Sequence, residues 1–360
     1  MSRIKFALAA TAAAAATLAT TGAHAQASNV TLYGLIDTTI STVNNTNAAG
    51  ARTTGFQIPW FSGSRWGLTG KEDLGGGVNA LFNLQAGFNP SSGRMSSNGT
   101  LFSRNSYVGL SSASAGTLTA GKQWNFNDDW LVGSVFKGGY NSGSIFKFSE
   151  FDAVSEIYNN TLKYVSPSFG GAQFGAMYGF GEQAGSFAQG SVFNLAARYN
   201  GGPLYLAATY DQERDVAGSG ALYKLITIGG SYTFGAAKLR LGAARADVGG
   251  AGTFQSIPSM SARKATAVEG GVDYALTSAF TVSGDVLYRR DSTLSNSTMV
   301  YRVLAQYSLS KRTTLLANVA YLKNSSGATE ALVNTSSGAI GGGVPGMTQT
   351  SVALGVRHAF

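Results

Sequence analysis

The sequence contains no cysteine and only two histidines among its 360 residues. Without cysteine, the chain has no disulfide framework and no thiolate ligand for a metal. His24 lies near the N-terminus and His358 near the C-terminus, so a serine–histidine hydrolase has no suitable base within the fold. These absences argue against an enzyme, a transition-metal site of the usual type and a bound cofactor.

Charged residues and long apolar runs are also scarce. Charged residues make up 12% of the chain, against a typical share of about 25% in soluble domains. Beyond the N-terminal segment, no apolar run reaches the roughly 18 residues that a membrane-spanning helix needs. The basic residues are dispersed along the chain, which argues against a nucleic-acid partner.

The first 25 residues have the pattern of a secretory signal peptide. A basic start with Arg3 and Lys5 precedes an alanine-rich apolar run at 6–19 and a small-residue cleavage site, Ala-His-Ala, that ends at residue 25. We predict that residues 1–25 are removed and that residues 26–360 form the folded domain. Loss of the two basic residues lowers the formal net charge from +8 to 8 − 2 = +6.

The remaining sequence is rich in glycine and has a two-residue periodicity. Glycine accounts for 48 of 360 residues, roughly twice its usual share. Apolar side chains recur at every second position in segments 80–88, 280–290, 300–309 and 348–360. Successive side chains of a strand point to opposite faces, so this alternation predicts strands with one apolar face. Phe360 lies on the apolar face of the last one.

Short and long connections alternate between the predicted strands. Seven short ones, such as 73–77 and 200–203, alternate with eight longer ones, and the longest covers about 124–157. An even number of antiparallel strands with this segregation of loop lengths is typical of an outer-membrane barrel. The predicted fold is therefore all-β: a 16-stranded antiparallel transmembrane β-barrel with long extracellular loops and short periplasmic turns. Because a lipid core offers no partner to unpaired backbone groups, strand 30–40 should pair with strand 348–360.

Two further features refine this prediction. Residues 291–298 are counted among the long connections, and His358 is expected to be an interfacial side chain. Aromatic residues beside the short turns predict an interfacial girdle; they are Tyr199, Tyr232, Phe234, Tyr274, Phe280 and Tyr307.

Several blocks spread along the whole chain carry a family resemblance. They are VTLYGLIDTTI (30–40), SRWGLTGKEDLGGGVNALFNLQAGF (64–88), SRNSYVGLSSASAGTLTAGKQ (103–123), NTLKYVSPSFGG (160–171), VEGGVDYALTSAFTVSG (268–284) and the terminal LGVRHAF. Together they resemble the trimeric Gram-negative porins of the betaproteobacterial type. The resemblance implies a homotrimer in the outer membrane, with a water-filled pore in each barrel for ions and small hydrophilic solutes. It also implies that Phe360 is the recognition signal for the barrel-insertion machinery.

The resemblance further implies that the third long loop folds inward and constricts the pore. Arg65 in SRWG, Arg104 in SRNSYVGL and Lys163 in NTLKY match the family's basic wall residues. Lys163 departs from the pattern, which usually has arginine there, and a lysine cannot form the same planar fork. Strand parity places Arg104 on the same side as Val108, which does not favour the lumen. The acidic counterparts expected on the loop are Asp128, Asp129, Glu150 and Asp152.

These features predict a passive diffusion channel with a weak preference for anions. A membrane wall cannot cheaply hold charges toward lipid, so mid-strand basic residues should face the lumen, where fixed charges select the sign of a passing ion. Those residues are Arg65, Lys71, Arg198, Arg240, Arg289, Arg302 and Arg357. The loop acids act in the opposite direction and would bring the pore toward neutrality.

Two alternatives stay open. A substrate-specific channel would line its lumen with an aromatic row, for which the candidates are Tyr33, Trp60, Trp66, Trp124 and Trp130. A surface adhesin or structural barrel would need a plugged lumen and longer external loops, whereas these loops are mostly short and rich in serine, glycine and asparagine.

Overall fold

The computed structural model describes residues 29–56, 61–137, 145, 148–257, 259–332, 334–335, 338–339 and 344–360, without the side chains of 149, 152, 155, 334–335 and 338–339. The predicted signal peptide and Trp60 lie outside the described residues. Among the helices of the described part, none is long and apolar enough to cross a membrane.

Strands make up most of the described chain. Sixteen long ones form the wall: β1 (Asn29–Val43), β3 (Arg65–Gly75), β4 (Val78–Gly87), β5 (Asn105–Ser112), β6 (Gly116–Trp124), β7 (Ile157–Val165), β8 (Ala172–Gly179), β9 (Val192–Gly201), β10 (Leu204–Arg214), β11 (Leu222–Phe234), β12 (Ala237–Val248), β13 (Arg263–Ala275), β14 (Phe280–Asp291), β15 (Asn296–Ser308), β16 (Thr313–Asn324) and β19 (Thr348–Ala359). The shorter elements are β2 (Thr53–Phe56), β17 (Asn334–Thr335), β18 (Gly338–Ala339) and the short helices η1 (Asn127–Leu131) and η3 (Ser149–Ser155).

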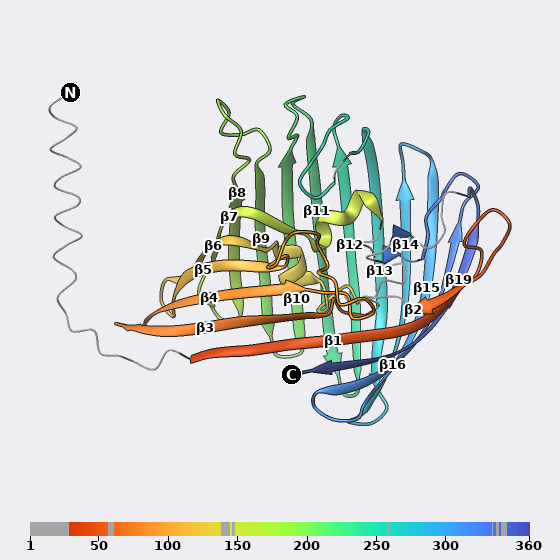
Figure 1. Cartoon of the computed structure of the whole chain (residues 1–360), viewed down its shortest axis with the longest axis horizontal. Coiled ribbons are helices and arrows are strands. Elements are labelled where there is room, and N and C mark those ends of the chain that lie inside the picture. Colours follow the sequence, from red (N-terminus) through yellow and green to blue (C-terminus); the bar gives the residue numbers. More distant parts are fainter. Residues whose placement is uncertain are drawn as a thin grey trace.

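The wall closes on itself by pairing its first long strand with its last (Figure 1). β1 and β19 are antiparallel, with Leu35 opposite Ala359 and Val43 opposite Ser351. Beyond β19, the backbone N–H and C=O of Phe360 bond to the C=O and N–H of Gly34, each at 3.0 Å. The predicted 16-stranded antiparallel barrel and its closure are therefore confirmed.

Most connections follow the predicted alternation of short turns and long loops. The seven short turns lie at one end of the barrel, and the third long loop, residues 125–156, is the longest connection. The prediction of a long connection near 291–298 is wrong, because only residues 292–295 separate β14 from β15. Asp291 closes this tight turn by accepting backbone hydrogen bonds from Thr293 and Leu294, each at 2.9 Å.

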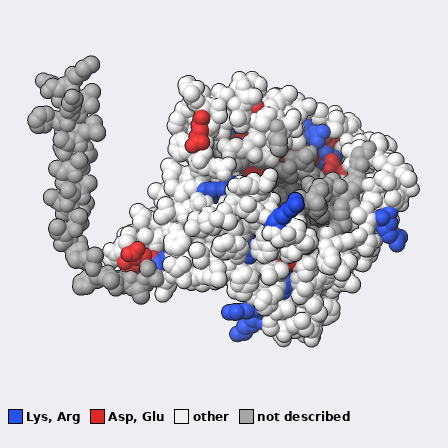
Figure 2. All heavy atoms as spheres, viewed as in Figure 1, with Lys and Arg blue, Asp and Glu red and all other residues white. Residues whose placement is uncertain are grey.

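Inward and outward side chains alternate along the strands as predicted. On β11, Tyr223 and Leu225 are fully buried inside, whereas Ile226 and Ile228 are about half exposed outside. The six girdle aromatics all have the outward parity of their strands beside the short turns. His358 and Phe360 have outward parity too. Uncharged residues form most of the face seen in Figure 2, as a wall against lipid requires.

Asp215 joins two outer loops. Its carboxylate accepts backbone N–H bonds from Thr253 of the loop 249–262 and from Ser219 of its own loop, each at 2.7 Å. These N–H groups hold the pKa of Asp215 at about 2, because they stabilise the charged form.

We expect the contact between these loops to survive mild acid. A carboxyl whose folded pKa is depressed contributes stability above its unfolded pKa of about 3.9, and that stability is lost as the pH falls through the folded value. Pepsin digestion of the folded barrel in micelles should leave residues 215–221 uncut at pH 3.5, whereas Asp215→Ala should be cut there. Equal cleavage of both proteins would contradict this role for Asp215.

Candidate functional site: the channel constriction

The third loop lies inside the barrel and is bound to one half of its wall (Figure 1). Phe126 donates its backbone N–H to Asn194 of β9 at 2.9 Å. Asn127 donates to Asp211 of β10 and accepts a hydrogen bond from Thr209 of the same strand. All five residues are buried, so the start of η1 is fixed by a polar network inside the lumen.

Glycines in the wall make room for the side chains of this loop. A Cβ atom at Gly175 of β8 would lie 2.2 Å from Cζ of Phe126, and one at Gly242 of β12 would lie 2.7 Å from the ring of Phe136. Real Cβ atoms do not approach other atoms this closely. Each glycine therefore lets an aromatic ring of the loop pack directly against the backbone of the wall.

Salt bridges attach the later part of the loop to the same side of the barrel. Glu150 is fully buried and contacts Arg289 of β14 at 2.5 Å and Arg263 of β13 at 3.6 Å. Lys137 binds Asp273 of β13 at 2.6 Å. Glu150, which was expected in the pore constriction, thus lies among the anchors of the loop. The side chain of Asp152 is outside the described residues.

The basic residues predicted to line the wall lie on the half of the barrel opposite the anchored part of the loop. Arg65 begins β3 and lies opposite Leu35, which is buried on the inner face of β1. Its guanidinium donates a hydrogen bond to the carbonyl of Gly63 at 2.9 Å. Among the described ion pairs within 4 Å, none includes Arg65, so its charge is not cancelled by a contacting carboxylate.

Arg104 also reaches the lumen, although strand parity did not favour this. β5 begins only at Asn105, so Arg104 precedes the strand and parity does not govern its direction. Its Nε donates to Oε1 of Gln85 on the inner face of β4 at 2.7 Å, and its guanidinium lies 4.9 Å from the ring centre of Trp124. The charge of Asp128 acts on both Arg104 and Arg65.

Lys163 of β7 forms an ion pair with Asp129 across the gap between the wall and η1. The ammonium also donates to the carbonyl of Trp124 at 2.7 Å and lies 4.5 Å from the ring centre of Phe126. A cavity of about 180 Å³ lies beside this pair, between the loop and strands β5–β7. These contacts bring together five candidates for the constriction: Asp128, Asp129, Arg65, Arg104 and Lys163.

Three of the other basic strand residues, Arg240, Arg289 and Arg302, form ion pairs with carboxylates that were not considered in the prediction. Arg240 contacts Asp273 at 3.1 Å and Asp285 at 2.5 Å, and Arg302 contacts Glu269 at 2.8 Å. The inward parity of these acids was the signal that would have revealed the pairing. In the described part of the chain, Arg198 has no carboxylate within 4 Å; it binds Gln173 and lies 4.8 Å from the ring centre of Trp130.

A closed barrel with an apolar outer wall and a charged, narrowed interior defines a channel-forming protein of a membrane. Sequence comparison gives the family: the chain belongs to the Gram-negative porins, whose pattern it matches over residues 9–327. It is a passive diffusion channel of the Gram-negative outer membrane, and members of this family and fold are channels.

Individual relatives agree with this assignment. The chain is 33% identical to outer membrane porin protein 32 of Delftia acidovorans and 31% identical to an outer membrane porin of Bordetella pertussis, over 96% of this chain and 98% of each relative. A solved anion-selective porin from Comamonas acidovorans superposes with a TM-score of 0.80 at 28% identity, covering 93% of this chain and all of that one. OmpT of Vibrio cholerae in its trimer form, at 17% identity and a TM-score of 0.67, shares the fold.

We expect Gly175→Ala to narrow the channel. The added methyl group would meet the ring of Phe126 at 2.2 Å and push it, with η1, away from the wall. Overpacking of this kind typically costs about 1–3 kcal/mol. Single-channel conductance in planar bilayers should fall, while Gly284→Ala should match the wild type, because a Cβ at Gly284 meets nothing within 4 Å. An unchanged conductance in Gly175→Ala would show that Phe126 does not position the loop.

Proposed function

We propose that the channel is a homotrimeric general porin with a weak preference for anions. The observation that carries the preference is the imbalance of charge around the constriction. Lys163 and Asp129 neutralise one another. Arg65 and Arg104 have no carboxylate within 4 Å in the described ion pairs and face the single charge of Asp128. Arg198 adds a third positive charge on the neighbouring wall.

The position of these charges determines how strongly they act. Fixed charges in a narrow, low-dielectric passage focus the field on a passing ion more than charges at a wide mouth do. Arg240, Arg289 and Arg302 are also in the lumen, yet their carboxylate partners cancel most of their field. The preference is therefore set by a few unpaired arginines, and it is weak because Asp128 opposes them. The similar porin from Comamonas acidovorans is anion-selective, which supports the same sign.

The trimer and the route of insertion are part of this proposal. OmpT, which shares the fold, has a trimer form, and this supports a trimer here. On β1 the outer face of the barrel exposes Val30, Leu32, Ile36 and Ile40, so this strand must be covered by lipid or by another subunit. Phe360 is 44% exposed beside Gly34, where its ring is available to the insertion machinery.

Removing the unpaired arginines should shift the selectivity toward cations. We expect Arg65→Gln/Arg104→Gln to lower the ratio of chloride to potassium permeability by roughly two- to tenfold, because local charge of this kind changes ion concentration in a cleft by about tenfold or more. The reversal potential under a tenfold salt gradient measures this ratio, and Asp128→Asn should move it the opposite way.

The control removes the same number of charges from the outer wall. Arg214→Gln/Lys323→Gln affects two side chains with outward parity and should leave the reversal potential unchanged. If both double variants shift it equally, total charge and not the constriction sets the preference. A wild-type potential that favours cations would contradict the proposed sign.

Phe360→Ala tests the proposed insertion signal. The substitution keeps the two backbone hydrogen bonds to Gly34 and removes only the ring. We expect less folded trimer in the outer membrane of cells, measured by gel mobility without heating, but normal refolding of the purified chain into micelles. A refolding defect as large as the defect in cells would instead assign the ring to stability.

A further inference from the structure

Four basic side chains point outward at the long-loop end of four adjacent strands. They are Lys224 of β11, Arg245 of β12, Lys264 of β13 and Arg290 of β14. Their neighbours along each strand, such as Tyr223, Ala246 and Arg289, are buried inside, so these four face away from the lumen. We call them the outer basic cluster. They are not needed for the field in the pore, because they lie on the other side of the wall.

The register gathers these side chains into one patch. Lys224 and Lys264 lie on either side of Asp247, and in the next row Arg245 and Arg290 lie on either side of Thr266.

The patch has a surplus of positive charge. Lys264 is 3.7 Å from Asp247, but both side chains are more than a third exposed, so this pair is weak. None of the ion pairs in the described part of the chain includes Lys224, Arg245 or Arg290. Four positive charges therefore face one carboxylate.

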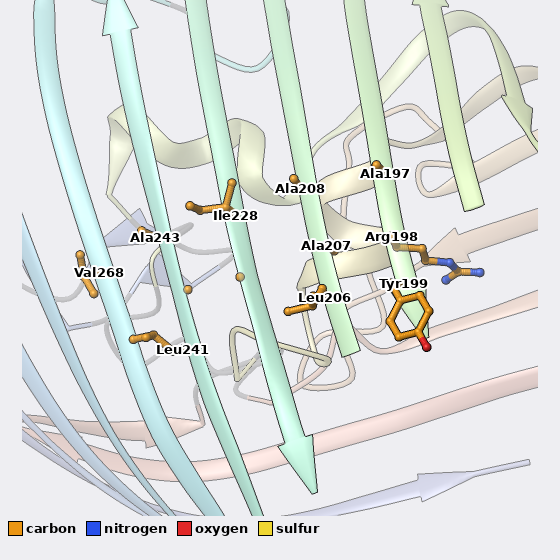
Figure 3. A pocket seen from close by; sticks show the side chains of 12 residues that line it. Ala197, Arg198, Tyr199, Leu206, Ala207, Ala208, Ile228, Leu241, Ala243 and Val268 are labelled. Carbon is orange, nitrogen blue, oxygen red and sulfur yellow. The ribbon is translucent and has the colours of Figure 1, made fainter. Parts of the chain in front are cut away.

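An apolar groove lies directly below the cluster on the same wall. One transverse row contains Ala197, Ala208, Ile228, Ala243 and Val268, each opposite the next across β9–β13. The small alanines leave a hollow between larger neighbours such as Leu206, Ile228 and Val268 (Figure 3). Its volume is about 630 Å³.

The cluster and the groove are spaced as the two ends of a lipid would be. Arg245 is two residues beyond Ala243 on β12, and Lys264 is four residues from Val268 on β13. At about 3.3 Å per residue, the charges lie about 7–13 Å from the groove along the tilted strands, on the side of the outer end. A charged side chain is strongly unfavourable on the lipid face at mid-membrane but is tolerated near the interface. This spacing matches charges at the level of lipid headgroups and a groove at the level of acyl chains.

We propose that this wall is a binding site for a phosphorylated lipid of the outer leaflet. Its phosphate is held by Arg245, Arg290 and the flanking lysines, and an acyl chain occupies the alanine-lined groove. Arginine suits this role because its planar guanidinium binds phosphate oxygens in pairs. A two-fold contact with a second copy of the chain fits poorly, because it would place the same positive patch on both sides. The site is independent of the ion preference of the pore.

The test is binding of lipid to the full refolded protein in neutral detergent. The probes are diphosphorylated lipid A, the same lipid after enzymatic dephosphorylation, and inorganic phosphate, each titrated while the retained lipid or ion is measured by native mass spectrometry. We expect the diphosphorylated lipid to bind with a defined stoichiometry and the other two to bind at least tenfold more weakly. Equal binding of dephosphorylated lipid would overturn the role of the cluster. Phosphate alone binding as tightly as the lipid would overturn the role of the groove.

Two variants separate the parts of the site. Arg245→Gln/Arg290→Gln should weaken binding roughly 30-fold, as about 1 kcal/mol per basic residue at a membrane surface implies. Lys311→Gln/Arg312→Gln removes the same charge from a turn at the other end and should bind like the wild type. Ala243→Trp fills the groove, keeps every charge, and should also weaken binding. No difference among these variants would overturn the proposal. So would self-association of the wild type that Ala243→Trp abolishes, because it would assign the groove to a second copy.

Discussion

The whole molecule depends on closing the ladder of backbone hydrogen bonds. A sheet edge in hydrocarbon would leave unpaired N–H and C=O groups, each at a cost of several kcal/mol, so strands can cross a bilayer only in a closed ring. Here the ring is completed by β1 and β19, from Leu35 opposite Ala359 to the bonds between Gly34 and Phe360. Once backbone pairing is complete, the side chains are free to divide by parity. Apolar side chains face lipid, and most of the polar and charged side chains discussed above face the lumen.

Inside the ring, charge has two separate uses. Arginines that meet carboxylates, such as Arg289 with Glu150 and Arg240 with Asp285, hold the third loop and brace the wall. Arg65 and Arg104 have no contacting carboxylate among the described ion pairs, and we propose that their field acts on the passage. Arginine therefore stabilises the structure on one half of the barrel, and in our proposal it selects ions on the other half. Removing one partner of a buried pair would leave the other charge buried and uncompensated. We therefore expect the half of the barrel that holds these pairs to tolerate substitution poorly.

The sequence predicted the features that follow from the two-residue period of strands, because alternation and turn residues are local. The strand count, the closure and the six aromatic residues beside short turns belong to this class. Prediction from the sequence failed where the position of a side chain depends on contacts with residues far along the chain. Glu150 was assigned to the constriction because its pairing with Arg289 is invisible locally, and parity misjudged Arg104 because the strand begins one residue later. The connection at 292–295 was misjudged because Asp291 closes it with its own side chain.

The wall glycines that receive Phe126 and Phe136 have a consequence for how such channels diversify. The number of strands fixes only the circumference of the cylinder, and the loop docked against one half of it sets the bore. Replacing one of these glycines by alanine, or one of the phenylalanines by a smaller residue, would shift the loop without altering any strand register. The width of the pore and the fit of the barrel to the membrane can therefore change independently. A bacterium that meets a new antibiotic or nutrient could adjust the pore width with one substitution and leave the lipid-facing wall unchanged.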